Sequence, residues 1–197
     1  ENATSISQRE ATRPAEAAPS PRASNTVGTE QNGAAEAGGL NTSAASLPDE
    51  RSARDLMIPV LNVRPADLSE TFSDSRSGGS RLHEAIDIMA PKGTSVVAAA
   101  PGEIERLFES DAGGLTIYVR SADRRTIYYY AHLDEYAEGL KEGQRVRRGQ
   151  RLGAVGSTGN ASPDAPHLHF AILQTTEEAS WWEPANAVNP YTLFTNR

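Results

Sequence analysis

Short runs of alternating apolar and polar residues, separated by turn residues, dominate the chain from about residue 53 onward. Successive side chains of a β-strand point to opposite faces, so alternation over about four to eight residues predicts half-buried strands. Many short strands at this spacing predict an all-β fold based on an antiparallel sheet, either a sandwich or an open barrel. Six segments show the pattern: Ser95–Ala100, Glu103–Phe108, Leu115–Val119, Thr126–Leu133, Arg151–Val155 and His167–Leu173.

Turn residues connect these segments in the order expected of hairpins. Asp111-Ala112-Gly113-Gly114 lies between the second and third segments and suits a tight β-turn. Ser121–Arg125 is a polar connection between the third and fourth. Only Leu133–Leu140 is compatible with a short helical turn, and the sequence has no long-period repeat.

The first fifty residues differ from the rest because they contain no Phe, Trp or Tyr. Their large aliphatic residues are only Ile6, Val27, Leu40 and Leu47. Four such side chains cannot offset a backbone ordering cost of about 1–2 kcal/mol per residue. We therefore predict a disordered low-complexity tail or linker over residues 1–52 and a folded domain over residues 53–197.

The formal charge of −7 is shared unevenly between these two parts. Of the 26 acidic and 19 basic residues, seven and three lie in the first fifty positions, which leaves 19 and 16 for the remainder. A folded part with so balanced a charge lacks the basic surface of a nucleic-acid-binding protein. The absence of cysteine excludes disulfides and thiolate metal sites.

Two features bear on where the protein acts. No apolar run approaches the roughly 20 residues that a membrane-spanning helix needs. The chain also begins at Glu1 instead of a methionine. We therefore expect that an N-terminal signal or membrane anchor upstream of residue 1 has been removed, and that the protein acts in the cell envelope, in the periplasm or outside the cell.

With no cysteine, a transition-metal site must use carboxylates and the four histidines, which are His83, His132, His167 and His169. His167 and His169 are two residues apart on a predicted strand, so they share a face and their backbones lie about 6–7 Å apart. Both imidazoles can then converge on one centre. Taken alone, the pair fits equally well two partly exposed histidines on a solvent face.

His132 lies near the end of the strand predicted over Thr126–Leu133. Straight alternation places Tyr128 and Tyr130 on the same face as His132, where they would form a polar, aromatic cleft wall and could orient a substrate. The same alternation places Tyr129 on the core face. Taken alone, His132 is better explained as a surface histidine beside a turn.

His83 and Asp87 would lie about 13 Å apart in a straight strand, whereas two zinc ligands approach within roughly 3–4 Å. The segment can therefore chelate a metal only if it is bent or helical. Gly78-Gly79 and Pro91 disfavour a helix, so we predict a loop that enters a strand near Asp87. Taken alone, the segment is better explained as an ordinary loop with a charged pair.

Taken together, the three segments resemble the motifs of one protein family. Arg81–Ile88, Tyr130–Leu133 and His167–Phe170 are similar, in this order, to the motifs of the lysostaphin/LytM-type zinc metallopeptidases. The resemblance covers about residues 72–173 and includes all four histidines. Four intervening segments are similar as well: Ala90–Thr94, Ala99–Gly102, Gly149–Gly153 and Gly156–Gly159.

The resemblance implies one zinc ion per chain, held by His83, Asp87 and His169 with a fourth position open for water. It also implies that His132 and His167 are the catalytic pair. One of them would take or orient the proton of water, and the other would stabilise the oxyanion or protonate the leaving amine. The implied reaction is hydrolysis of peptide cross-links in bacterial cell-wall peptidoglycan, and we expect D-alanyl bridges to be favoured over glycyl bridges.

Three alanines depart from the family pattern. Ala85 and Ala165 stand where glycine is usual, and Ala171 stands where glutamate is common. Glycine near residue 85 would permit a positive φ at the predicted bend. No predicted ligand is lost through these departures.

Two other functions fit parts of the sequence. Val146–Gly153 resembles a turn of biotinyl and lipoyl carrier domains, but neither Lys92 nor Lys141 occupies the expected hairpin tip. The second alternative is a non-catalytic LytM-type regulator that activates other cell-wall hydrolases. Such domains have typically lost zinc ligands, whereas all five predicted site residues are present here.

Overall fold

The computed structural model describes residues 56–76 and 81–196. The tail predicted over residues 1–52 therefore lies outside the described residues. Within the described part, no helix is both long and apolar enough to cross a membrane.

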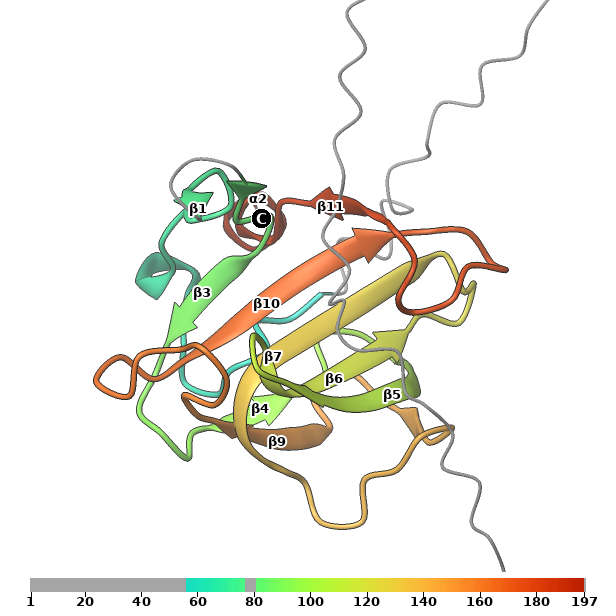
Figure 1. Cartoon of the computed structure of the whole chain (residues 1–197), viewed down its shortest axis with the longest axis horizontal. Coiled ribbons are helices and arrows are strands. Elements are labelled where there is room, and N and C mark those ends of the chain that lie inside the picture. Colours follow the sequence, from blue (N-terminus) through green and yellow to red (C-terminus); the bar gives the residue numbers. More distant parts are fainter. Residues whose placement is uncertain (1–55, 77–80, 197) are drawn as a thin grey trace, which may run out of the picture.

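A nine-stranded antiparallel sheet forms most of the molecule, which confirms the predicted all-β class (Figure 1). The strand order is β11-β10-β7-β6-β5-β8; β3 also pairs with β10, and β9 pairs with both β7 and β4. The strands are β3 (Ile86–Met89), β4 (Ser95–Val97), β5 (Gly102–Ser110), β6 (Gly114–Arg120), β7 (Thr126–Tyr136), β8 (Arg145–Val146), β9 (Arg151–Val155), β10 (His167–Gln174) and β11 (Asn186–Val188).

The remaining elements are short. β1 (Ser75–Arg76) pairs with β2 (Arg81–Leu82) in a separate two-stranded sheet. Helical structure among the described residues is limited to the 3₁₀ turn η1 (Pro65–Asp67) and the C-terminal helix α2 (Pro190–Thr195). Asn189 caps α2, because its side chain accepts a hydrogen bond from the backbone N–H of Tyr191.

Leu133–Leu140, the segment compatible with a short helical turn, forms no helix; a strand occupies its first part and a turn closed by the Leu140 N–H and the Ala137 carbonyl its end. β7 continues to Tyr136 because its last residues pair with β9, opposite Gly153 to Val155. The Tyr136 hydroxyl also contacts the carbonyl oxygens of Phe108 and Thr116, at 3.1 Å each. Both contacts hold the strand extended past the predicted end.

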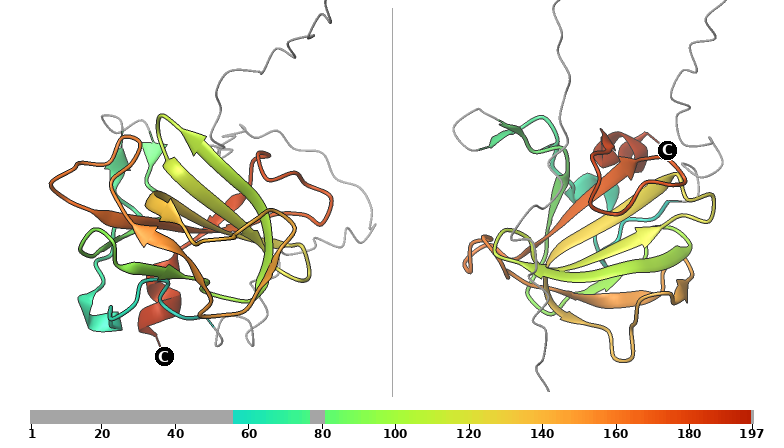
Figure 2. Two further views of the ribbon diagram at one scale, coloured as in Figure 1. Left: turned by 90° about the horizontal axis from the view of Figure 1, so that it is seen from below. Right: turned by 45° about the vertical axis from the view of Figure 1, so that its right-hand side comes forward.

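The sheet is curved (Figure 2). Buried apolar side chains from its strands form one hydrophobic core. Alternate residues of β10 (Leu168, Phe170 and Ile172) are buried there. Tyr130 and Tyr128 of β7 lie directly opposite Phe170 and Ile172 and are also core residues. The faces predicted for the tyrosines of β7 are therefore wrong. Tyr128 and Tyr130 lie on the core face, whereas Tyr129 lies on the face of His169.

Candidate metal centre

Two of the predicted ligands are adjacent across a strand pair. Asp87 of β3 lies directly opposite His169 of β10 in the antiparallel register. Directly opposed side chains of an antiparallel pair project from the same face. His169 Nδ1 and Asp87 Oδ1 are 3.1 Å apart.

His83 reaches the same point through a bend in the chain just before β3. Glu84 has a φ of 58°, a left-handed conformation that is uncommon outside glycine. Backbone hydrogen bonds hold the bend, from His83 to Asp74 and from Glu84 to Phe72. The positive φ thus falls on Glu84 and not on Ala85, so the alanine at 85 adopts an ordinary conformation.

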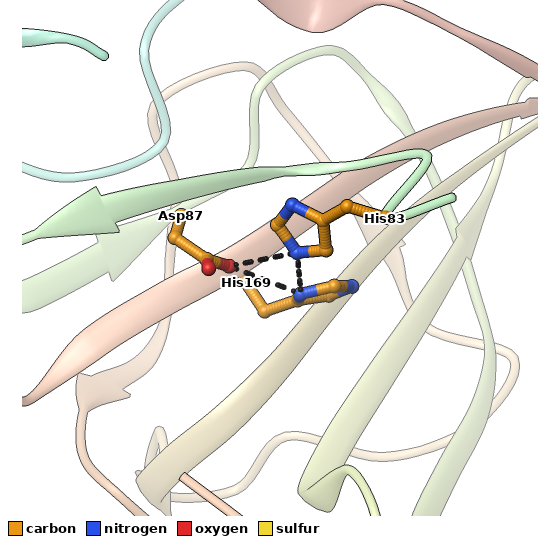
Figure 3. A group of neighbouring side chains, drawn as sticks. All are labelled: His83, Asp87 and His169. Carbon is orange, nitrogen blue, oxygen red and sulfur yellow. Dashed lines mark hydrogen bonds and ion pairs between the residues drawn. The ribbon is translucent and has the colours of Figure 1, made fainter. Parts of the chain in front are cut away.

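The bend brings three ligand atoms together (Figure 3). His83 Nε2 lies 2.9 Å from His169 Nδ1 and 3.1 Å from Asp87 Oδ1. Two imidazole nitrogens and one carboxylate oxygen at these separations form a group that could hold a metal ion. The structure therefore brings together His83, Asp87 and His169, the three residues that the family resemblance implies as ligands.

Thr71 contacts two of these three residues, although the sequence analysis did not identify it as a site residue. Its carbonyl oxygen lies 2.9 Å from His83 Nδ1, and its hydroxyl accepts a hydrogen bond from the Asp87 backbone N–H at 3.1 Å. A proton on His83 Nδ1 leaves the lone pair of Nε2 for a metal, as in many metal sites in proteins. Thr71 precedes the three motifs, and no pattern in the sequence links it to them.

His132 lies in the site because β7 is irregular at this residue. His132 has a φ of 60°, and its backbone N–H donates a hydrogen bond to the Gly113 carbonyl. This conformation turns the imidazole toward the face of His169, with the two ring centroids 5.6 Å apart. His132 Nδ1 lies 2.9 Å from the carbonyl oxygen of Thr158, in the Gly156–Gly159 segment.

His167 completes the group of four histidines. Its ring centroid lies 5.0 Å from that of His132, and its Nε2 lies 3.8 Å from Asp87 Oδ1. The Nδ1 atom of His167 lies 2.8 Å from the Ala165 carbonyl oxygen. In both His132 and His167, a proton on Nδ1 satisfies the backbone carbonyl and leaves Nε2 as a proton acceptor.

The surroundings of the site shift the pKa values of three groups. Burial lowers the pKa of His132 to about 4, so this imidazole is neutral at pH 7. Burial also lowers the pKa of His169, against the opposing effect of Asp87. Burial alone would raise the pKa of Asp87, but hydrogen bonds from His169 and His83 outweigh it and hold that pKa well below its usual range. Neutral imidazoles beside a carboxylate are the protonation states that bind a divalent metal.

The arrangement is that of an all-β protein with a three-residue cluster that could hold a metal ion and a second histidine pair on the same side of one sheet. A family model described as Peptidase family M23 matches residues 81–181. The chain belongs to this family, and the resemblance to lysostaphin/LytM-type peptidases is confirmed.

Two relatives with similar sequences are named as endopeptidases. The L-Ala–D-Glu endopeptidase of Bacillus subtilis (strain 168) is 37% identical over 117 residues, which are 56% of this chain and 36% of that protein. Peptidoglycan DD-endopeptidase ShyC of Vibrio cholerae is 34% identical over 110 residues, 54% of this chain and 24% of that protein. The chain therefore spans about a third or less of the length of these two relatives.

A solved structure has a similar fold. The catalytic domain of the antimicrobial peptidase lysostaphin from Staphylococcus simulans matches with a TM-score of 0.53 and 28% identity. The match covers 64% of this chain and 93% of that domain.

Proposed function

We propose that this protein is a zinc-dependent endopeptidase that hydrolyses peptide cross-links of bacterial cell-wall peptidoglycan. The observation that supports this most is the combination of the His83–Asp87–His169 cluster with His132 and His167 on the same side of the sheet. A cluster without the second pair would suffice to bind a metal but would provide no group for proton transfer. Membership of family M23 and the names of the two relatives support the substrate class.

The residues of this chain divide the work between holding the metal and moving protons. His83, Asp87 and His169 are the proposed ligands, and two histidines with one carboxylate are a ligand set that zinc uses in catalytic sites. When bound, zinc supplies Lewis acidity, which polarises an amide carbonyl and lets water act as a nucleophile at neutral pH. His132 Nε2 and His167 Nε2 would accept the proton of the attacking water and return it to the leaving amine.

We further propose that D-alanyl bridges are favoured over glycyl bridges. The name of the Vibrio cholerae relative refers to a DD-endopeptidase, and that of the Bacillus subtilis relative to an L-Ala–D-Glu endopeptidase. Both names refer to bonds that involve D-amino acids. A substrate of this kind agrees with the proposed location in the cell envelope.

The test compares three substrates with zinc-loaded full-length protein: a D-Ala-linked muropeptide dimer, an uncross-linked stem peptide with its L-Ala–D-Glu bond, and pentaglycine. Mass spectrometry of the products identifies the bond that is cut, and a chelator control shows the metal dependence. We expect preferential cleavage of the dimer at the D-alanyl bridge. Faster cleavage of pentaglycine would overturn the preference, and no cleavage of any substrate, combined with stimulation of another wall hydrolase, would favour the regulatory alternative.

A further inference from the structure

The face of the sheet that carries the metal centre also carries an unbroken row of aromatic rings. The ring centroid of His169 lies 5.9 Å from that of Tyr129, which lies 4.7 Å from Tyr118. Tyr118 lies 4.8 Å from Trp181, and Trp181 lies 5.6 Å from Trp182. The row therefore leads from a proposed metal ligand, across β7 and β6, to Trp182, whose surface is 56% exposed.

Trp181 packs against residues of the sheet as well as against Trp182. Its ring packs against Phe108 of β5 at 5.2 Å as well as against Tyr118. The guanidinium carbon of Arg106 lies 5.8 Å from the centre of the same ring, within the range of a cation–π contact. Trp181 is therefore partly buried by these contacts, and Trp182 is the more exposed of the two indoles.

The backbone next to the two tryptophans is also anchored to the sheet. Arg120 is 1% exposed, is paired with Glu105 and donates a hydrogen bond to the Ala179 carbonyl at 2.8 Å. Arg124 Nε donates to the Glu177 carbonyl at 3.1 Å. A surface that is held in place before binding loses little conformational entropy when a ligand arrives.

Charges of both signs lie near the two tryptophans, since Arg106 packs against Trp181 and Arg125 pairs with Glu177. Glu178 and Glu183 are exposed carboxylates on the same segment, and the Glu183 carboxylate accepts a hydrogen bond from the Ser180 backbone N–H. Carboxylates repel an anionic group but accept hydrogen bonds from hydroxyls. A ligand that combines an apolar face with hydroxyl groups, as a sugar ring does, matches an exposed indole flanked by these carboxylates.

The row of aromatic rings is long enough to reach a part of the substrate that lies several residues away from the cleaved bond. Three ring-to-ring steps of 4.7 to 5.9 Å separate His169 from Trp181. An extended peptide rises about 3.3 Å per residue, so a peptide of about five residues at most spans the same path. A peptide cleaved at the metal centre would bring the sugar at its far end to the two tryptophans.

We propose that Trp182, supported by Trp181, is a subsite for a neutral sugar ring of the glycan strand to which the substrate peptide is attached. This proposal rests on the proposed peptidoglycan hydrolase function. The negative face of the indole attracts the polarised C–H bonds on one face of the sugar, while the hydroxyls stay in contact with water and the flanking carboxylates. The protein would then select peptides that are still attached to glycan.

The test uses two substrates with the same cross-linked peptide, one carrying its disaccharide and one without it. We expect the full-length, zinc-loaded protein to have a lower KM for the glycosylated substrate. Trp182→Ala should raise that KM roughly three- to tenfold, the size of one aromatic stacking contact, and leave the KM for the sugar-free peptide unchanged. Trp182→Phe should retain much of the difference, and Leu61→Ala, which truncates another exposed apolar residue, should change neither KM.

An equal rise in both KM values would show that Trp182 contacts the peptide and would overturn the sugar subsite. Unchanged KM values in Trp182→Ala would overturn it as well. If the wild-type protein cuts neither substrate, the proposed function fails, and the subsite is tested by binding alone. Intrinsic fluorescence of chelator-treated protein should then respond to the free disaccharide in the wild type and not in Trp182→Ala; no response in the wild type would overturn the subsite.

Discussion

The three proposed ligands each contribute one atom to a small cluster. We expect the purified protein to carry about one zinc ion per chain and His83→Ala, Asp87→Ala and His169→Ala each to lose it, because three protein ligands leave no redundancy. Elemental analysis after gel filtration measures the bound metal. Full zinc occupancy in one of these variants would show that its residue is not a ligand.

His132 and His167 lie beside the cluster without belonging to it. His132→Ala and His167→Ala should therefore keep zinc and fold but lose about 10²–10⁴ in turnover, the usual contribution of a general acid or base. Zinc content and circular dichroism are the controls for each variant. Near-normal turnover in either variant would contradict its role, and zinc loss in the His167 variant would mean that His167 and His169 have exchanged roles.

Thr71 provides a test of how the ligands are positioned. Thr71→Val keeps the carbonyl that faces His83 but removes the hydroxyl that accepts the Asp87 N–H. Loss of such a supporting contact typically weakens metal affinity by about 10–100-fold, so competition with a chelator should show a drop of at least about tenfold. Thr71→Ser retains the hydroxyl and should restore the affinity; equal affinities in all three proteins would show that the contact does not support the metal.

At the scale of elements, the site depends on how closely β9 approaches β7 and β10. A Cβ atom at Gly156 would lie 2.4 Å from the Asp134 nitrogen and 2.8 Å from the His132 carbonyl oxygen. Gly156 also forms a bridge with His167, so it lies between both members of the proposed catalytic pair.

Gly156→Ala should therefore lower the free energy of unfolding by about 1–3 kcal/mol, as overpacked sites do, and reduce turnover. Urea unfolding and a peptide-cleavage assay measure the two effects. Ser157→Ala, in the same segment, is the matched control and should leave both near wild type. Wild-type stability in Gly156→Ala would show that the strands separate at no cost.

At the scale of the whole molecule, buried tyrosines make the free energy of unfolding decrease at high pH. Burial raises the pKa of Tyr128 to about 12 and also raises the pKa of Tyr118 and Tyr130. A phenol whose pKa is higher in the folded state contributes its full stability below the unfolded value of about 10, and this contribution is lost as the pH rises toward 12.

The free energy of unfolding should therefore fall steeply above about pH 10. At pH 11 the loss due to Tyr128 is about 1.4 kcal/mol, which corresponds to one pKa unit. Urea unfolding of wild type and Tyr128→Phe between pH 8 and pH 11 measures it, and the variant should show the shallower decline. Parallel declines in the two proteins would show that Tyr128 does not titrate differently in the folded state.

The sequence by itself determined the all-β class, most strand positions and the identity of the candidate site residues. Side-chain alternation is a local property of an extended chain, so it can be recognised at His167–Leu173 without knowledge of the partner strands. The absence of cysteine restricted any metal site to histidines and carboxylates, and the order of the three motifs indicated the family.

Only the tertiary structure decided how these residues meet. His83 and His132 reach the site through positive φ values at Glu84 and at His132 itself, which are uncommon outside glycine and here accompany hydrogen bonds to other segments. The face of β7 that is buried depends on β10 lying beside it, which is why Tyr129 and not Tyr130 lies near His169. Contacts between segments far apart in the chain, such as those of Thr71 and Trp181, leave no periodic signal in the sequence, because they depend on which surfaces the folded chain brings together.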